Sequence, residues 1–226
     1  MFIMCFYVNV NIEKEKLKNN LNFIKKINSR FNKDSSTLNE VSAFTFPDLP
    51  ILTFQQEEYV ISDFNWGLIP DWVNPNELNQ YRKNTLNARL ETIDEKISFK
   101  NYTQQRGVLT LNGFYEWQHI GKNKNKYYIK SSSQDFIYVA VIYNSLQFDN
   151  VTTKSFSMIT TCANELMSEI HNTKKRMPLM LNQSYLQEWL NPKYKINEIL
   201  SDINSNLNHD LKAELVSKPQ DQISLF

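Results

Sequence analysis

The sequence contains few of the residues that mark several common protein classes. Its 226 residues include two cysteines, four glycines and three histidines. Two cysteines cannot form a disulfide framework, and neither stands at a metal-ligand spacing from a second cysteine or a histidine. Gly-rich phosphate loops of the Walker A and dinucleotide-binding types are absent, and so is the Gly-x-Ser-x-Gly motif of serine hydrolases. We therefore expect neither a metal nor a cofactor.

An excess of charge of one sign is also lacking. The chain carries 25 Lys+Arg against 24 Asp+Glu, a formal net charge of +1. This balance excludes a histone-like or DNA-coating protein but is compatible with a local basic cleft. No apolar run approaches the roughly 18 residues of a membrane span, and the first ten residues lack the basic leader and long apolar region of an export signal. We expect a cytoplasmic protein with no membrane partner.

What the sequence does contain predicts one α+β domain. Hydrophobic residues make up 41% and aromatic residues 13%, enough for a sizeable core, and the length favours a single domain. Strand-like runs outnumber helices and follow one another like hairpins, which indicates a curved, mostly antiparallel sheet. These runs are 51–54, 59–66, 108–111, 114–119, 127–129, 136–143, 156–161 and 177–181.

The longest expected helix covers Glu13–Phe31. Apolar residues recur there at spacings of three and four, and the opposite face is basic, with a net charge of +5 between Asn11 and Lys33. Two interpretations stay open, a solvated lysine face and a phosphate-facing helix. Further helices are predicted for 98–105, for 164–170 with Asn164 as N-cap, and for 183–190, and the chain beyond Pro192 is polar and helix-leaning.

With glycine so rare, Gly67 and Gly113 are predicted to occupy positions that need a positive φ or a close approach of another backbone. Both stand beside aromatic residues.

Two ionisable residues are candidates for acid–base chemistry. Glu116 lies between Tyr115 and Trp117 in a predicted strand. It is either an exposed strand residue or a cleft acid whose pKa burial would raise, which would suit it to proton transfer. His171 ends a predicted helix and is either a helix-terminal charge or a catalyst.

Cys5 carries the most distinctive chemistry if it becomes the first residue of the mature chain. Met4 is itself a plausible initiator, and its removal would leave Cys5 with a free α-amine beside its thiol. Such an amine, with a pKa of about 7.7–8.0, condenses with an aldehyde to an imine, and the thiol then closes a thiazolidine ring. The alternative is a buried apolar cysteine near a strand.

Five motifs in order resemble the SOS-response-associated peptidase (SRAP) family of abasic-site processing proteins. The motifs are Met4-Cys5, Trp66-Gly67-Leu68-Ile69-Pro70-x-Trp72, Asn87-Ala88-Arg89-x-Glu91-Thr92, Gly113-Phe114-Tyr115-Glu116-Trp117, and Thr160-Thr161-x-Ala163-Asn164-x-x-Met167-x-x-Ile170-His171 with Arg176-Met177-Pro178. The resemblance implies one domain over residues 4–226 with a barrel-like core and flanking helices. Residues 1–3 would be a start-site extension or a removed segment.

The resemblance also implies a reaction. The chain would bind single-stranded DNA at an abasic site and form a covalent thiazolidine between Cys5 and the ring-opened sugar aldehyde. It would expose Cys5 as an autopeptidase and show lyase activity. Asn87 would position Cys5, Glu116 would shuttle protons, and His171 would assist opening of the sugar ring.

The same resemblance assigns the DNA contacts. Arg89 and Arg176 would hold the flanking phosphates, and a guanidinium can bind a phosphate through two hydrogen bonds. Trp66 and Trp117 would stack on neighbouring bases, or else pack in the core.

The chain departs from the family pattern at three places. Three residues precede Met4, the usual Cys-Gly-Arg opening is Cys5-Phe6-Tyr7, and four residues rather than one separate His171 from Arg176. Two other functions stay open, a cysteine-dependent peptidase acting on other peptides and a non-catalytic module that binds single-stranded DNA. We expect a monomer.

Overall fold

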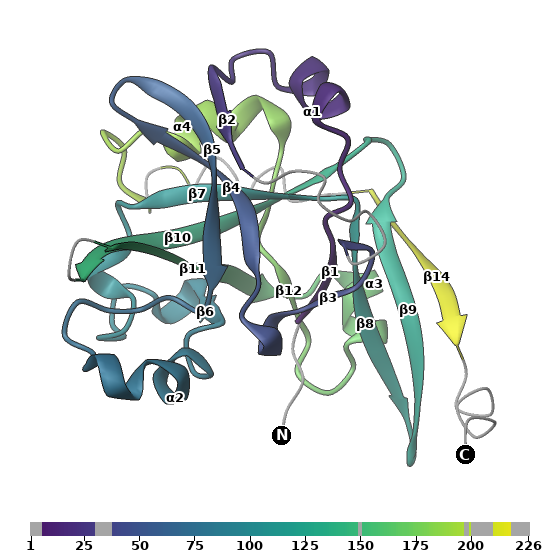
Figure 1. The fold of residues 1–226 in the computed structure, drawn as a ribbon. Helices are drawn as coiled ribbons and strands as arrows, with labels where there is room; N and C mark the ends of the chain where they lie inside the picture. The colour runs from purple at the N-terminus through teal and green to yellow at the C-terminus, as the bar shows by residue number, and fades with distance from the viewer. Residues whose placement is uncertain (1–5, 30–37, 149–150, 197–198, 200–209, 218–226) are drawn as a thin grey trace.

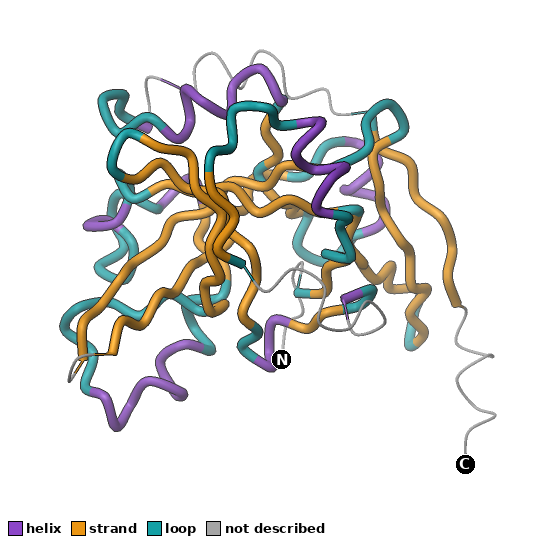
Figure 2. Tube along the Cα trace, turned by 45° about the horizontal axis from the view of Figure 1, so that its top comes forward, coloured by secondary structure: helices purple, strands orange, loops and turns teal. Residues whose placement is uncertain are grey.

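The computed structural model describes residues 6–29, 38–148, 151–196, 199 and 210–217 (Figure 1). Strands make up the body of this part of the chain, and short helices lie around it (Figure 2). The expected α+β fold on a curved, mostly antiparallel sheet is confirmed.

Five strands close into a mixed barrel. They pair in the order β11-β10-β7-β4-β5, each pair antiparallel, and β5 then pairs with β11 in parallel through Ser155↔Asn65 and Phe156↔Trp66. Closure satisfies backbone groups that an open sheet would leave at its edges. The strands are β4 (Asp48–Gln55), β5 (Glu58–Trp66), β7 (Arg106–Leu111), β10 (Ile137–Phe148) and β11 (Val151–Cys162).

A second sheet of five strands lies beside the barrel, to its right in Figure 1. Its order is β14-β9-β8-β1-β3, so β14 forms one outer edge. The strands are β1 (Tyr7–Asn9), β3 (Val41–Ser42), β8 (Gly113–Ile120), β9 (Asn123–Ser131) and β14 (Leu211–Ser217).

Short elements complete the described part of the fold. The remaining strands are β2 (Lys26–Asn28), β6 (Asn87–Arg89), β12 (Arg176–Pro178) and β13 (Met180–Leu181). The helices are α1 (Lys14–Asn20), α2 (Leu78–Arg82), α3 (Glu165–Ile170) and α4 (Leu186–Leu190), and 3-10 turns cover Ala43–Thr45, Pro75–Glu77, Leu90–Thr92, Lys100–Tyr102 and Gln183–Tyr185. Among the described residues, no helix has the length and apolar character needed to cross a membrane.

The core consists of two apolar clusters on opposite faces of the barrel strands. In β10, Val139 and Val141 belong to one cluster, whereas Tyr138, Ala140 and Ile142 belong to the other. Successive side chains of a strand point to opposite faces, so a strand covered on both faces is apolar along its whole length.

The strand predictions are confirmed, but three helix expectations differ from the structure. Of the helix expected over 98–105, only the 3-10 turn Lys100–Tyr102 forms. Only Lys14–Asn20 of the expected Glu13–Phe31 helix is helical, and Lys26–Asn28 instead pairs in parallel with β5. Leu211–Ser217 is a strand on β9 where the sequence leans towards helix. In both segments, pairing with a neighbouring strand overrides the local propensity, and residues 30–33 lie outside the described part.

Two lysines of the basic stretch between Asn11 and Lys33 favour the interpretation as a solvated lysine face. Lys16 pairs with Asp135 at 2.7 Å, and Lys26 pairs with Glu58 at 2.8 Å. These lysines are neutralised by acids of this chain, so nothing in their contacts points to phosphate.

Both glycine predictions are confirmed. Gly67 has φ +106°. At Gly113 a Cβ atom would lie 2.5 Å from the carbonyl oxygen of Ile129 and 2.6 Å from the ring of Tyr128, because β8 and β9 approach closely there.

Replacing Gly113 by alanine is expected to lower the free energy of unfolding by about 2–4 kcal/mol, because the methyl group would push β9 away from β8. Gly121→Ala is the matched control. Its Cβ would meet nothing within 4 Å, and only its φ of +61° is strained, which costs about 1 kcal/mol. Urea unfolding followed by tryptophan fluorescence measures both, and equal losses would contradict the close approach.

Candidate functional site

The site is centred on a buried carboxyl–imidazole pair. Glu116 lies in β8, and His171 directly follows α3. His171 Nε2 and Glu116 Oε1 are 3.6 Å apart, and both side chains are only 1–2% exposed. The sequence therefore identified two residues that the fold brings together, and the burial of Glu116 rules out the exposed interpretation.

Helix α3 ends directly before His171, and hydrogen bonds cap both of its ends. The Asn164 side chain accepts a hydrogen bond from Met167 N at 2.9 Å, as predicted for an N-cap, and His171 N donates to Met167 O at 2.8 Å. Met167 and Ile170 are buried in the apolar cluster that also contains Phe114 of β8. Packing of α3 on β8 thus decides where the imidazole lies.

The other imidazole nitrogen faces the backbone of Arg176. His171 Nδ1 lies 2.9 Å from Arg176 O and 3.3 Å from Arg176 N. When Nδ1 carries a proton and donates it to the carbonyl oxygen, Nε2 faces Glu116, and a proton can lie on either member of the pair. The geometry suits a group that takes up and returns one proton.

Asn172 ties the same two elements together, and the sequence analysis missed it. Its side chain accepts a hydrogen bond from His119 N at 3.1 Å and donates one to His119 O at 2.8 Å. Asn172, directly after His171, and His119, three residues after Glu116, are therefore joined by two hydrogen bonds. No local pattern marks such a contact, because it depends on the packing of α3 against β8.

Arg176 is engaged by Glu91 rather than open to a ligand. Its two terminal nitrogens bind both carboxylate oxygens at 2.7 and 2.8 Å, and Nη2 also donates to Thr160 O at 2.7 Å. Burial opposes ionisation of Glu91, but the hydrogen bonds from Arg176 outweigh it and lower the pKa of Glu91 to about 2. Arg176 is buried, and its expected phosphate contact stays a prediction.

Asn87 and Arg89 lie on the neighbouring strand β6. This strand pairs in parallel with β11, with Asn87 opposite Met158 and Arg89 opposite Thr160. Ala88 between them is buried, Asn87 is half-buried, and Arg89 is exposed. Arg89 is therefore placed to meet an anion from solvent.

Of the two tryptophans expected to stack on bases, Trp66 is a core residue. It is fully buried, stacks on Phe156 with ring centroids 5.6 Å apart, and donates from Nε1 to Leu86 O at 2.8 Å. The stacking expectation for Trp66 is therefore wrong in this conformation. Its indole instead holds the residue that directly precedes Asn87.

Trp117 is half-buried and meets Tyr7 edge-on at 5.0 Å. The sequence analysis overlooked Trp72, which is half exposed and packs edge-on against Tyr81. Its place in the Trp66–Trp72 motif was the available signal.

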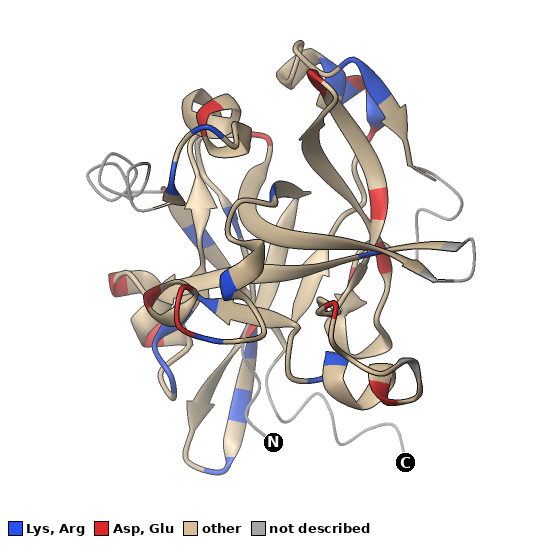
Figure 3. Cartoon of the chain, turned by 90° about the vertical axis from the view of Figure 1, so that its left-hand side faces the viewer, with Lys and Arg blue, Asp and Glu red and all other residues tan. Residues whose placement is uncertain are grey.

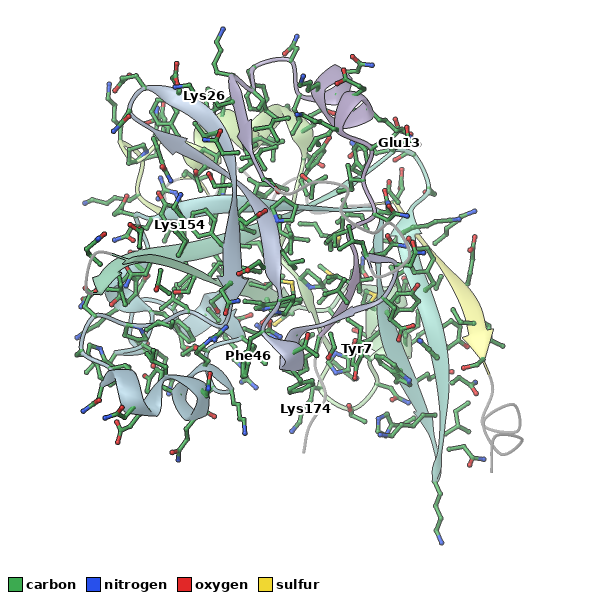
Figure 4. All side chains as sticks on the ribbon, viewed as in Figure 1. Tyr7, Glu13, Lys26, Phe46, Lys154 and Lys174 are labelled. Carbon is green, nitrogen blue, oxygen red and sulfur yellow. The ribbon has the colours of Figure 1, made fainter. Side chains whose placement is uncertain are left out.

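Exposed lysines lie on the hairpin that contains Glu116 and on the loop that follows His171. Figure 3 shows them along the β8–β9 hairpin and at its tip, at the bottom of the view. Lys122 and Lys124 of this hairpin are exposed, as are Lys174 and Lys175 after His171. Tyr7 and Lys174 are labelled towards the lower end of the molecule in Figure 4.

The described chain begins beside Glu116. Strand β1 runs antiparallel to β8 with Tyr7 opposite Tyr115, so the register brings Phe6 level with Glu116. Phe6 is held there by a hydrogen bond from Ala43 N to its carbonyl oxygen at 2.7 Å. Cys5, the expected nucleophile, lies outside the described residues.

Comparisons with known sequences agree on one family. The model of the SOS response associated peptidase (SRAP) family matches residues 4–220. The abasic site processing protein YoqW of Bacillus subtilis is 35% identical over 136 residues, 59% of this chain and 58% of that protein. The abasic site processing protein HMCES of Xenopus tropicalis is 30% identical over 155 residues, 59% of this chain and 45% of that protein. The matches thus span less than two thirds of these relatives.

Solved structures share the fold over nearly the whole chain. A protein from Bacteroides thetaiotaomicron superposes with a TM-score of 0.82 and 33% identity, covering 94% of this chain and 92% of that one. A protein from Bordetella bronchiseptica superposes with a TM-score of 0.76 at 17% identity over 95% of this chain and 100% of that one, which shows the fold alone. Because the family model spans almost the entire sequence, this chain belongs to the SOS response associated peptidase family.

Proposed function

We propose that the chain processes abasic sites in single-stranded DNA by forming a thiazolidine crosslink through Cys5. The observation that carries this proposal is the buried Glu116–His171 pair, which lies level with the residue that follows Cys5. Two relatives bear the name abasic site processing protein, which supports the same class of substrate.

The chemistry needs a free amine and a free thiol on one residue. Loss of a base leaves a sugar whose ring-opened form has an aldehyde at C1′. The Cys5 amine adds to C1′ and expels water to give an imine. Cys5 Sγ then bonds to C1′, the C=N electron pair returns to nitrogen, and nitrogen takes up the proton that the thiol loses. No oxidant or reductant is needed.

The buried pair supplies the proton transfers. Dehydration needs an acid at the departing oxygen, and ring closure needs a base that accepts the thiol proton. A single group that is first protonated and then deprotonated can serve both steps. Glu116 fits this role because His171, 3.6 Å away, can hold or return the proton. His171 would also assist opening of the sugar ring, and Asn87 would orient the amine.

Residues 1–4 have to be absent before this chemistry can start. Either translation begins at Met4 and that methionine is trimmed, or the chain removes residues 1–4 itself, as the family description of a peptidase suggests. Strand cleavage as a lyase would follow if, before the ring closes, the imine loses its C2′ proton, the C3′–O bond breaks and the 3′ phosphate leaves by β-elimination.

The DNA contacts are proposed from exposure and charge. Arg89 is exposed at the β6 edge, and the lysines of the β8–β9 hairpin lie at the same end of the fold as Glu116. Trp117 offers a half-buried ring for a neighbouring base, a contact worth about 1–3 kcal/mol.

Wild-type protein incubated with a single-stranded oligonucleotide containing one abasic site is expected to give a band that survives boiling in SDS. Cys5→Ala and Cys5→Ser should both abolish it, because an oxazolidine is far less stable than a thiazolidine. Cys162→Ala, at the other, exposed cysteine, should crosslink normally.

Mass spectrometry of the N-terminus completes this test. A reactive protein beginning at Cys5 supports the proposal, and a reactive protein still intact from Met1 refutes it. Turnover of peptides without any crosslink would favour the peptidase alternative.

Glu116→Gln should slow crosslinking by about 10²-fold while leaving DNA affinity unchanged, because the amide cannot exchange a proton. Single-turnover gel assays measure the rate, and fluorescence anisotropy measures binding. Glu169→Gln, on the exposed face of α3, is the matched control. A normal rate in Glu116→Gln would remove this residue from the mechanism.

Glu91→Gln should lower the melting temperature at pH 7, by about 3–6 °C after allowing for screening of the partly exposed carboxylate. Since the folded-state pKa of Glu91 is about 2 against an ordinary 4.5, its contribution is present above pH 4.5 and is lost as the pH falls towards 2. The difference from wild type should therefore shrink between pH 5 and pH 3. Glu95→Gln, exposed nearby, should show no such trend.

A further inference from the structure

Strand β14 leaves one edge unpaired among the described strands. It pairs antiparallel with β9 on one side and forms the outer edge of its sheet, at the outer right of the fold in Figure 1. Leu215 and Val216 near its end are 43% and 51% exposed. An edge strand of this kind presents a row of backbone donors and acceptors with which a further strand can pair.

The register on β9 shows which of these backbone groups face outward. Ser132 N donates to Asp210 O at 2.9 Å, one position before the register that pairs Leu211 with Ser131. In an antiparallel pair, residues that bond to the neighbouring strand alternate with residues that face away from it. The even-numbered residues of β14 therefore face β9, and the N–H and C=O groups of residues 211, 213 and 215 point to the outer edge.

The sequence of β14 is self-complementary about Ala213. It runs Leu211-Lys212-Ala213-Glu214-Leu215. When two copies lie antiparallel with their Ala213 residues opposite each other, Lys212 faces the partner's Glu214 and Leu211 faces the partner's Leu215. Ala213 is one of the outward-facing residues, so the two alanines can exchange both backbone hydrogen bonds across a two-fold axis.

The side chains suit this pairing on both faces of the strand. Lys212 and Glu214 lie on one face, 52% and 49% exposed, and occupy positions at which facing side chains of a strand pair approach most closely. A lysine on an edge normally opposes pairing with another strand, but here a carboxylate lies opposite it. On the other face, Leu211 and Ala213 pack against a core cluster, and the partner's Leu211 would cover the exposed Leu215.

We propose that two copies of this chain pair along β14 and join their five-stranded sheets into one. This goes beyond the proposed function, because it needs no DNA chemistry, and it departs from the expected monomer. The joined sheet holds the two β8 strands, which carry Glu116, five strand spacings apart, about 24 Å in the hydrogen-bonding direction. The two sites are thereby held at a fixed separation.

Sedimentation equilibrium of the full chain between about 5 and 500 μM tests the pairing, a range suited to small interfaces. The wild-type mass should rise from 26.7 kDa towards twice that value. Lys212→Glu and Glu214→Lys should each weaken the dimer at least about tenfold, because like charges then lie directly opposite. An equimolar mixture of the two variants should recover dimers, since every carboxylate then faces a lysine. Lys96→Glu, at an exposed lysine outside β14, is the matched control and should dimerise like wild type.

Ala213→Pro tests the backbone side of the contact. Proline removes an N–H that faces the outer edge and none that faces β9, so the dimer should be lost while the fold is kept. All of these variants should crosslink an abasic oligonucleotide at the wild-type rate, which separates a failure of the pairing from a failure of the proposed function.

A wild-type protein that stays monomeric at about 500 μM would overturn the proposal. So would dimers of Lys212→Glu and of Glu214→Lys that are as tight as those of wild type. A mixture of these two variants that recovers no dimer would refute the register centred on Ala213.

Discussion

Pairing along both edges of β11 is the constraint on which the rest of the described structure depends. One edge pairs with β10 and then β12, and the other pairs with β5 and then β6. The contact with β5 closes the barrel, while β6 and β12 carry Asn87, Arg89 and Arg176 into fixed register. Because the backbone bonds of all four neighbours converge on one strand, a shift of β11 would displace the barrel seam and the site together.

The buried Glu116–His171 pair is held in place by hydrogen bonds from the surrounding segments. Glu116 and His171 lie in an interior where an isolated charge would be costly, and each has the other within ion-pair distance. The Arg176 backbone holds the imidazole, and Asn172 joins the two segments that carry the pair. The Arg176 side chain is in turn occupied by Glu91. Such support fixes the geometry of the Glu116–His171 pair within the folded chain.

The expectations that held were those based on local patterns. Strands were predictable because alternating and continuous apolar runs depend on neighbouring residues, and the Asn164 cap was predictable because capping is local. The helix expected over Glu13–Phe31 failed beyond Asn20, since Lys26–Asn28 finds backbone partners on β5 that no local pattern reveals. The same cause turned Leu211–Ser217 into a strand.

By itself, the sequence determined which chemical groups are available: an acid in a strand, an imidazole after a helix, and glycines where backbones approach. These follow from residue type and short spacing. Only the tertiary structure decided that Glu116 meets His171, that Glu91 engages Arg176, and that Trp66 is enclosed beside Leu86 instead of facing DNA. These outcomes rest on pairings between distant segments, whose free energy comes from closing the barrel and burying its two apolar clusters.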